Sequence, residues 1–361
     1  MRTPRILWLA ALAASPALAQ TETTTAADRA PASGWQQCAQ ETRDPAARLA
    51  CYDRWVQQQG SSSVPPPAGP ADAVARAPDC RSGPQSALSR YWELEPGSDC
   101  GRFTIRGYRP ISLSWIHSDT VNRAPSSPTA GHTASSETPY LIQEGRIQLS
   151  VRTKVGQGFL PVSEVGGRDS LWFGYTQQSY WQIFTSSISR PFRNTDHEPE
   201  FMYIVPTPAN LPGGWRLRYS GLSINHQSNG QSLPLSRSWN RAILMAGMEK
   251  GDRYTVTARL WNRIADGDET DDNPGIEKLI GRGELSGSWQ VNQDHTLMLT
   301  LRHSLASEAN GSYRLEWLRT LDSNSAGLRL HVQLFNGYGD SLVDYNRART
   351  VLSIGLSLVD F

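Results

Sequence analysis

Three polar residues whose side chains could carry out nucleophilic catalysis lie close together in the sequence. His226 and Ser228 are two positions apart. In an extended strand such residues point to the same face, roughly 6.6 Å apart along the chain, so an imidazole can reach the hydroxyl. Asn240 follows in the next segment, where a neighbouring hairpin strand can bring it beside His226. The set predicts a serine nucleophile, a histidine base and an amide that orients the imidazole.

The same stretch has a simpler structural interpretation. Asn229-Gly230 is the type of residue pair that most strongly favours a two-residue β-hairpin turn, and His226 and Ser228 would then be its polar flanks. The local sequence leaves both interpretations open. The elements that position these residues must decide between them.

The composition limits the classes of protein that could hold such a site. The formal net charge of +1 favours neither nucleic acid nor an anionic membrane surface as a partner. A hydrophobic content of 38% and a mean hydropathy of −0.47 exclude a bundle of transmembrane helices. The chain nevertheless carries 12 Trp, 12 Tyr and 8 Phe. A transmembrane β-barrel explains both facts, because only every second residue faces lipid and aromatic residues gather at the interfaces.

The N-terminal residues have the pattern of a secretory signal peptide. Arg2 and Arg5 precede an apolar run from Ile6 to Ala14, and Ala17-Leu18-Ala19 offers a small-residue cleavage site. The apolar run is too short to span a membrane. We therefore expect residues 1–19 to be removed and the protein to be exported.

A cysteine-containing region precedes the expected barrel. Residues 20–59 are expected to form a small helical periplasmic segment, and residues 60–102 a Pro/Ser-rich linker and lead-in. All four cysteines lie in this region, and an oxidising periplasm favours disulfides. Of three possible connectivities we expect the local pairs Cys38–Cys51 and Cys80–Cys100. No CxxC pair is present, which argues against a zinc site.

Residues 103–361 alternate short strand-like segments with turns and are expected to form the barrel. Tight turns such as Leu211–Gly214 alternate with longer loops such as 118–139 and 264–275, the asymmetry of an outer-membrane barrel. An even strand number closes the sheet without an unpaired edge. We predict an all-β, twelve-stranded antiparallel transmembrane barrel, with a soluble secreted β-sandwich as the alternative. The expected segments are 104–117, 141–153, 169–183, 200–207, 214–226, 238–249, 252–263, 276–287, 295–303, 312–320, 327–336 and 349–361.

Strand phase assigns the catalytic candidates to the outer face of this barrel. Leu222 and Ile224 alternate with polar residues, and His226 and Ser228 continue the same face. Histidine and serine are unfavourable against lipid unless they act on something in the membrane. The phase therefore favours a lipid substrate over a plain turn.

With these residues in view, the chain resembles the outer-membrane phospholipase A family of Gram-negative bacteria, whose members are twelve-stranded barrels. The resemblance runs from about residue 104 to the end. The motifs that carry it are His226–Gly230, Ser236–Arg241, Tyr175–Gln182, Pro191–Arg193, Thr270–Pro274 and Gly337–Asn346.

The resemblance implies hydrolysis of the acyl ester bonds of phospholipids and lysophospholipids. Ser228 would attack the acyl carbonyl, and His226 would take the proton and return it to the departing alcohol. Asn240 would fix the imidazole's orientation. The backbone N–H of Gly230 would stabilise the developing oxyanion, together with calcium.

The resemblance also implies one Ca²⁺ per active site at the interface of a homodimer, so that dimerisation activates the enzyme. Its ligands would be the Ser236 hydroxyl, the backbone carbonyl of Gln231 and Ser189 of the partner subunit, oxygen ligands that suit calcium. Gln177 would be an intersubunit hydrogen-bond partner.

Two residues depart from the family pattern. Gln231 stands where relatives commonly carry arginine, and a backbone contact survives that change. Leu233 stands where relatives commonly carry an acidic residue, which forms a second calcium site with Asp272 in inactive monomers. The loss of one carboxylate predicts a weaker second site. For Asp271 and Asp272 two interpretations stay open, metal ligands and solvated loop charges.

The resemblance implies a multi-pass outer-membrane protein inserted by the outer-membrane assembly machinery. Two alternatives stay open: a catalytically silent barrel (porin or adhesin), and a soluble secreted esterase that needs no detergent for extraction. The complete set of three catalytic residues argues against the silent barrel. Lys278, Arg237 and Arg241 are expected to be lumen or rim charges rather than binders of substrate phosphate. The N-terminal segment lies outside the resemblance.

Overall fold

The structure is a computed structural model that describes residues 38–39, 44–59, 85–95, 97–160, 167–190, 192–265, 267, 271–321 and 327–358. The expected signal peptide and most of the linker lie outside these residues. The chain divides into two compact units, Met1–Ala75 and Arg76–Phe361. Each unit is described by itself.

The first unit contains helix α2, Pro45–Gln59. Asp44 precedes it, and its carboxylate accepts a hydrogen bond from the N–H of Ala46 at 2.8 Å, as a helix N-cap does. A disulfide joins Cys38 and Cys51, which confirms that expected pair. The expected Cys80–Cys100 pair lies outside the described residues because Cys80 is not among them. In the described part of the chain, no helix has the length and apolarity required to cross a membrane.

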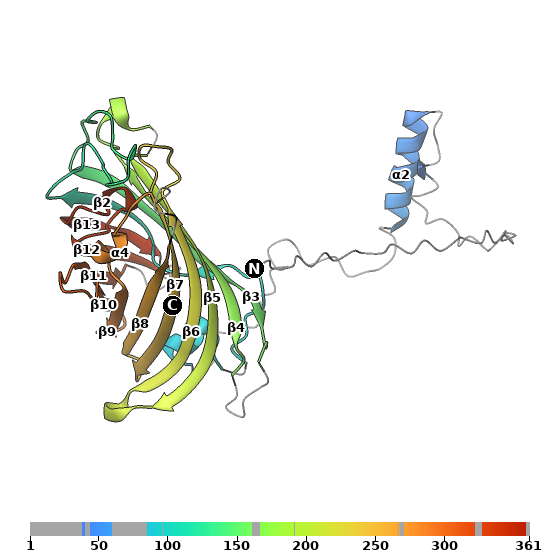
Figure 1. Cartoon of the computed structure of the whole chain (residues 1–361). Coiled ribbons are helices and arrows are strands. Elements are labelled where there is room, and N and C mark those ends of the chain that lie inside the picture. Colours follow the sequence, from blue (N-terminus) through green and yellow to red (C-terminus); the bar gives the residue numbers. More distant parts are fainter. Residues whose placement is uncertain are drawn as a thin grey trace, which may run out of the picture. The chain divides into compact units, whose positions relative to one another are not determined.

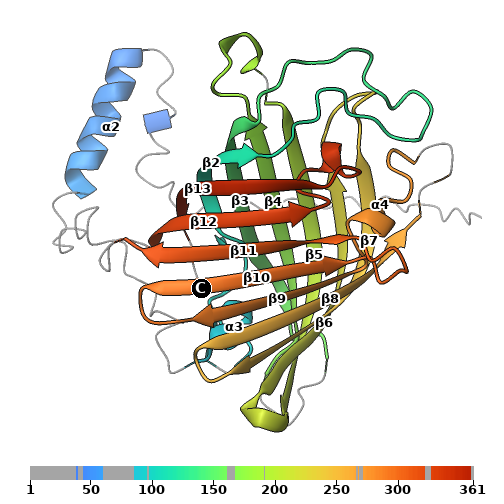
Figure 2. The same ribbon diagram turned by 90° about the vertical axis from the view of Figure 1, so that its left-hand side faces the viewer.

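The second unit is an antiparallel barrel of twelve strands, β2 to β13, in the part of the chain that the structure describes (Figures 1 and 2). Each strand pairs with its neighbours in sequence. β13 pairs with β2, which closes the sheet and confirms the predicted fold. A two-residue strand, β1 (Arg106–Gly107), adds to β3. The strands are β2 Ile111–Ser118, β3 Gln143–Gln157, β4 Ser170–Trp181, β5 Asn194–Asn210, β6 Arg216–Ser228, β7 Ser238–Lys250, β8 Tyr254–Ile264, β9 Gly283–Gln290, β10 His295–His303, β11 Gly311–Thr320, β12 Leu328–Gly337 and β13 Arg349–Leu358.

Two of the expected segments differ from the structure. The expected strand 276–287 begins with a short helix, α4 (Ile276–Leu279), before β9 starts at Gly283. Ile276 and Ile280 are four apart and both buried, a helical spacing that the strand interpretation missed. The expected 200–207 is only the centre of β5, which runs past Pro206 through a register shift.

The connections differ in length between the two ends of the barrel. Residues 211–215, 251–253 and 291–294 make tight turns at one end. The connections from β2 to β3, β4 to β5, β8 to β9 and β12 to β13 are longer and lie at the other end. The nine-residue loop between β6 and β7 belongs to the long-loop end, so the candidate site lies there.

The two faces of the barrel have opposite character. Outward side chains such as Leu222 (59% exposed) and Ile224 (65% exposed) form an apolar belt, as lipid contact requires. Inward side chains are polar and paired: Glu198, for example, accepts from both Arg109 and Arg241 at 2.9 Å. The phase predicted from the sequence is therefore correct.

A short helix packs against the inner face of the barrel. Helix α3 comprises Ala87–Trp92 (Figure 2). It is capped by Ser86, whose hydroxyl accepts from the N–H of Ser89. The N–H of Leu88 donates to the carboxylate of Glu249 on β7 at 3.2 Å. The helix completes an apolar cluster with inward residues of β4 to β7, made of Leu88, Trp92, Leu94, Tyr108, Trp172, Met202, Ile204, Tyr219 and Met245.

Candidate active site

The hydrogen bond between His226 and Asn240 is the centre of the site. The two residues are directly paired between β6 and β7. Nδ1 of His226 lies 2.8 Å from Oδ1 of Asn240. An amide oxygen only accepts, so Nδ1 donates, and Nε2 is left as the nitrogen that can accept a proton. This is the tautomer that a general base needs.

Ser228 ends β6 on the same outer face as His226. Its cross-strand neighbours are Ser238 on β7 and His197 on β5. His226 is exposed and Ser228 is half-buried, so both are accessible from the lipid side. The structure thus brings the three predicted residues, Ser228, His226 and Asn240, to one edge of the outer surface.

The interpretation of Asn229-Gly230 as a two-residue turn is wrong. The loop runs from Asn229 to Arg237, and the buried Asn229 side chain closes it. Asn229 Oδ1 accepts from the N–H of Arg237 at 2.9 Å, and Nδ2 donates to the carbonyl of Leu235 at 2.8 Å. Gly230 has φ +60°, a left-handed conformation that favours glycine. The loop is therefore a fixed extension of the site.

Hard oxygen atoms converge where the calcium site is expected. The Ser236 hydroxyl donates to Oδ2 of Asp272 at 2.7 Å, and the Ser238 hydroxyl approaches the same oxygen at 3.2 Å. The other carboxylate oxygen, Oδ1, lies 3.0 Å from Nε2 of His132. Two hydroxyls and one carboxylate oxygen at one point fit calcium's preference for hard oxygen ligands. Asp272 is thus part of a packed cluster and not a solvated charge.

The other expected ligands are more widely spread. The Gln231 side chain donates to Asn194 Oδ1 at 3.0 Å, which anchors its backbone. The hydroxyl of Ser189, just after the 3-10 helix η1 (Ser186–Ile188), donates to the carbonyl of Ser186 within its own loop. Among the described residues, no group of three or more His, Cys, Asp or Glu side chains could hold a metal. In one copy of the chain, the hydroxyls of Ser189 and Ser236 hydrogen-bond to different partners.

Asp271 and Leu233 do not add ligands to this cluster. The carboxylate of Asp271 pairs with Arg263 at 2.6 Å and accepts from the N–H of Asn273. Its role is structural, which corrects its interpretation as a solvated loop charge. Leu233 is 62% exposed, and its side chain has no atom that binds a cation.

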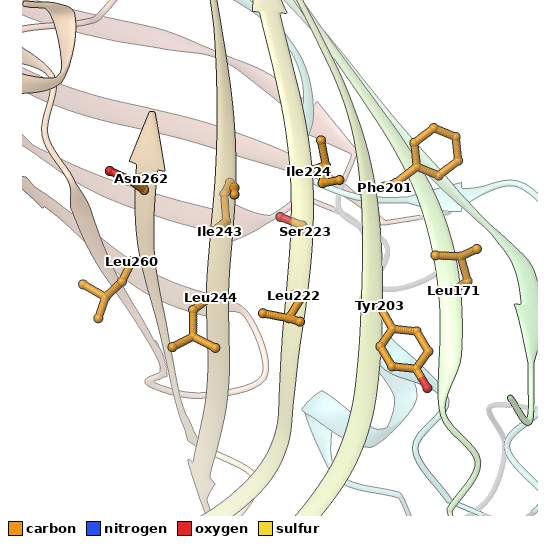
Figure 3. A pocket seen from close by; sticks show the side chains of 11 residues that line it. Leu171, Phe201, Tyr203, Leu222, Ser223, Ile224, Ile243, Leu244, Leu260 and Asn262 are labelled. Atoms are coloured by element: carbon orange, nitrogen blue, oxygen red, sulfur yellow. The ribbon is translucent and has the colours of Figure 1, made fainter. Parts of the chain in front are cut away.

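An apolar groove continues from the site along the outer face of the barrel. Its volume is about 590 Å³. Figure 3 shows Leu222 and Ile224 on β6, the strand that carries His226 and Ser228. Neighbouring strands complete the groove, which is lined by Leu171, Phe201, Tyr203, Leu222, Ser223, Ile224, Ala242, Ile243, Leu244, Leu260 and Asn262.

Comparison with known proteins places this fold and site in one family. The family model for phospholipase A1 matches residues 88–358. The chain belongs to the phospholipase A1 family. The structure is similar to that of outer membrane phospholipase A from Escherichia coli, with a TM-score of 0.62 and 30% identity over 72% of this chain and all of that one. A Salmonella typhi outer membrane phospholipase dimer with bound calcium matches with a TM-score of 0.61 and 29% identity, over 72% of this chain and 93% of that one.

A phospholipase A1 relative from Neisseria meningitidis is 34% identical, over 90% of this chain and 90% of its own. A match of that coverage is not confined to residues 103–361. The relative therefore shares part of the N-terminal segment, which corrects the expectation that this segment lies outside the resemblance. The chain is an outer-membrane β-barrel of the phospholipase A1 family.

Gln177 is held in this family member by neighbours on its own outer face. Oε1 lies 3.2 Å from the hydroxyl oxygen of Tyr175, and Nε2 donates to the Ser179 hydroxyl at 3.2 Å. The Thr195 hydroxyl donates to the same Ser179 oxygen at 3.0 Å. The residue is half-buried and faces outward, at the height of His197 and Ser228.

Two of the three cationic candidates, Arg237 and Arg241, have partners away from the proposed nucleophile. Arg237 is fully buried in the loop, where its guanidinium donates to the carbonyls of Pro234, Ser236 and His132. Burial lowers the pKa of this guanidinium. Arg241 points inward to Glu198.

Two histidines of the site were missed by sequence reasoning. His132 reaches Asp272 from the long loop 119–142, and no periodicity predicts the path of a loop. His197 is directly paired with Ser228. The sequence shows a histidine at this position but does not show that it lies beside Ser228. The exact register between β5 and β6 is what reveals it, and that register depends on where β5 ends.

Proposed function

We propose that this protein hydrolyses acyl ester bonds of phospholipids and lysophospholipids, by a Ser228-His226-Asn240 triad that depends on calcium and is activated by homodimerisation. The observation that carries the proposal is the 2.8 Å hydrogen bond from His226 Nδ1 to Asn240 Oδ1 on a lipid-facing surface. A histidine with a purely structural role would not need an exposed ring that is oriented by an amide beside an accessible serine. The triad explains both the exposure and the pairing.

The chemistry follows from these atoms. Ser228 Oγ attacks the acyl carbonyl carbon while Nε2 of His226 takes the hydroxyl proton. The bond to the glycerol oxygen then breaks, and Nε2 returns the proton to that oxygen. Water attacks the acyl-serine in the same way, which releases the fatty acid. The backbone N–H of Gly230 donates to the carbonyl oxygen while it is negatively charged.

The apolar groove supports a lipid substrate. Leu222 and Ile224 lie on the strand of the triad, four and two residues before His226, so an acyl chain along β6 would bring its ester to Ser228. Burial of the chain in this groove contributes about 0.8 kcal/mol per methylene. The groove selects for long acyl chains rather than for a particular headgroup.

Calcium would be held by Ser236, the Gln231 carbonyl and Ser189 of the partner subunit, with Asp272 at the same cluster. The convergence of Ser236 and Asp272 at 2.7 Å supports this assignment, and so does the calcium in the dimer of the Salmonella typhi relative. When bound, calcium adds positive charge beside the oxyanion, which compensates for the neutral Asn240.

The proposed dimer places Gln177 at its interface. The exposed apolar groove and the separate hydrogen-bond partners of Ser189 and Ser236 in one copy support a second copy that completes the site. We also propose insertion by the outer-membrane assembly machinery.

The test is fatty-acid release by purified protein from mixed micelles of phospholipid and detergent. Wild type is expected to be active with Ca²⁺, inactive after chelation, and active again when Ca²⁺ is restored. Ser228→Ala is expected to be inactive throughout. If wild type releases no fatty acid, the chain is a silent barrel; if Ser228→Ala remains active, the nucleophile is another residue.

A further inference from the structure

A second imidazole lies beside the proposed nucleophile, on the side away from His226. His197 of β5 is directly paired with Ser228 of β6, and it is half-buried on the outer face. Side chains of directly opposed residues have Cβ atoms about 4.5–5.5 Å apart. The ring of His197 is therefore within reach of any group bound at Ser228.

One ring nitrogen of His197 is anchored. Nδ1 lies 2.7 Å from the hydroxyl oxygen of Tyr175, and the two rings stack with centroids 6.2 Å apart. The Tyr175 proton has two acceptors within reach, His197 Nδ1 at 2.7 Å and Gln177 Oε1 at 3.2 Å. Donation to the nearer acceptor leaves the ring proton of neutral His197 on Nε2. Nε2 is also a donor in the protonated ring.

The other ring nitrogen faces the oxyanion glycine. A Cβ atom placed on Gly230 would lie 3.6 Å from Cδ2 and 3.7 Å from Nε2 of His197. Within the part of the chain that the structure describes, Nε2 has no hydrogen-bond partner. Nε2 can therefore donate to a ligand bound at this position.

Other side-chain donors near the loop are already used. The Arg237 guanidinium donates to carbonyl oxygens of the loop and of His132, and Arg241 donates to Glu198 inside the barrel. His226 is assigned to the proton transfer by its bond to Asn240. His197 is a neighbour of both Ser228 and Gly230. Its Nε2–H is available to donate to the negatively charged oxygen of the reacting ester.

We propose that His197 is a catalytic residue of the proposed esterase reaction, a second donor of the oxyanion hole. Its Nε2–H donates to the carbonyl oxygen as that oxygen becomes negative in the attack by Ser228, while the Gly230 N–H donates from the loop. Tyr175 positions the ring through Nδ1. This inference rests on the proposed function and adds a side-chain donor to it.

The test compares His197→Phe, which keeps an aromatic ring but has no donor, with His197→Gln, which keeps an N–H donor. Loss of one oxyanion-hole donor costs about 10²–10³ in kcat. We expect His197→Phe to lower kcat by about 10²-fold with KM nearly unchanged, and His197→Gln to recover part of it. Tyr175→Phe is expected to fall between wild type and His197→Phe. His117→Phe, on the outer face of β2, is the matched control.

Two substrates and one inhibitor separate this role from others. His197→Phe should lower kcat by the same factor with phospholipid and with a long-chain p-nitrophenyl ester, which lacks phosphate. The rate of inactivation by an alkyl p-nitrophenyl phosphonate, which forms the oxyanion geometry on Ser228, should fall in parallel. A loss confined to phospholipid would make His197 a phosphate contact and overturn the proposal.

The proposal is also overturned if no variant changes kcat, or if His197→Phe loses activity only because it loses the dimer, as crosslinking in detergent would reveal. Folding is checked by the heat-dependent mobility of the barrel in SDS gels. Failure of the proposed function is distinguishable, since wild type would then hydrolyse neither substrate.

Discussion

At the scale of single residues, the site combines a neutral orienting side chain with a histidine on a lipid-facing strand. Asn240 fixes the tautomer of His226 through one hydrogen bond of 2.8 Å, yet it carries no charge to stabilise the imidazolium. Additional stabilisation must therefore act on the oxyanion. Gly230, calcium and His197 are the groups to which this task is assigned.

Removal of the orienting amide should impair turnover rather than binding. We expect Asn240→Ala to lower kcat by about 10²-fold, within the range of a general-base contribution. KM should change little because the groove is untouched. Steady-state kinetics in mixed micelles measure both values. Asn210→Ala, the same substitution at the exposed tight-turn end of β5, is the control, and an unchanged kcat in Asn240→Ala would contradict the assignment.

Restoring a carboxylate at position 233 should strengthen calcium binding. Leu233 is 62% exposed in the loop that also carries Ser236, and a carboxylate there adds a hard ligand. We expect Leu233→Asp to bind Ca²⁺ about tenfold more tightly in calorimetric titrations of the detergent-solubilised protein. Leu305→Asp, at a loop leucine of equal exposure, should have no effect. Equal affinity in wild type and Leu233→Asp would show that this position is too far from the cation.

At the scale of elements, two neighbouring strands and their loop supply the proposed triad, and an inner helix supports the wall behind them. Much of this was predictable from the sequence. The alternation of Leu222 and Ile224 with polar residues predicted the correct outer face. Lipid favours apolar side chains on one face of a barrel strand, and the lumen favours polar ones on the other. The pairing of His226 with Asn240 follows from a hairpin of two adjacent strands.

Other parts could not be predicted, for physical reasons. The role of Asn229-Gly230 was ambiguous in the sequence because the Asn229 side chain bonds to the N–H of Arg237, eight positions later. A turn motif does not extend that far. The contact of His132 with Asp272 depends on a loop path, which has no period. The α4 helix interrupted an expected strand because Ile276 and Ile280 pack into the cluster of Trp239 and Trp261.

The contact of α3 with the inner wall should contribute to stability. Buried Glu249 accepts from Arg218 at 3.2 Å and from the N–H of Leu88 at 3.2 Å. Removal of one partner of a buried pair costs about 3–5 kcal/mol. We expect Glu249→Ala to lower the free energy of unfolding in urea by about 3 kcal/mol, since Arg218 keeps Glu95 as a partner.

Hydrogen exchange at α3 should accelerate in Glu249→Ala as well. Lys250→Ala, at the exposed next position on β7, is the control and should leave both measurements unchanged. Destabilisation without faster exchange at α3 would mean that Glu249 stabilises the barrel wall but not the contact between the wall and α3.

At the scale of the whole barrel, the inner face is packed and its charges are paired. Glu198 binds Arg109 and Arg241, and Glu200 binds Arg259. Such ion pairs join facing strands across the interior. We therefore expect the lumen to support the outer wall rather than to conduct solutes.

This packing predicts that the protein does not conduct. Purified protein in planar lipid bilayers should give no discrete conductance steps, whereas an open porin inserted in the same way gives them. Stepwise conductance would favour the porin alternative. Such steps together with calcium-dependent fatty-acid release would mean that the interior opens without affecting the triad.

The outward opening of the groove at Leu222 and Ile224 has a kinetic consequence. In the proposed function, substrate reaches Ser228 by diffusion within the plane of the membrane, and both products leave into the same plane. The relevant concentration is then the mole fraction of phospholipid in the surrounding leaflet, not its amount per volume of solution. Dilution of substrate with inert detergent at constant total lipid should slow the reaction, whereas dilution of the whole suspension with buffer should not.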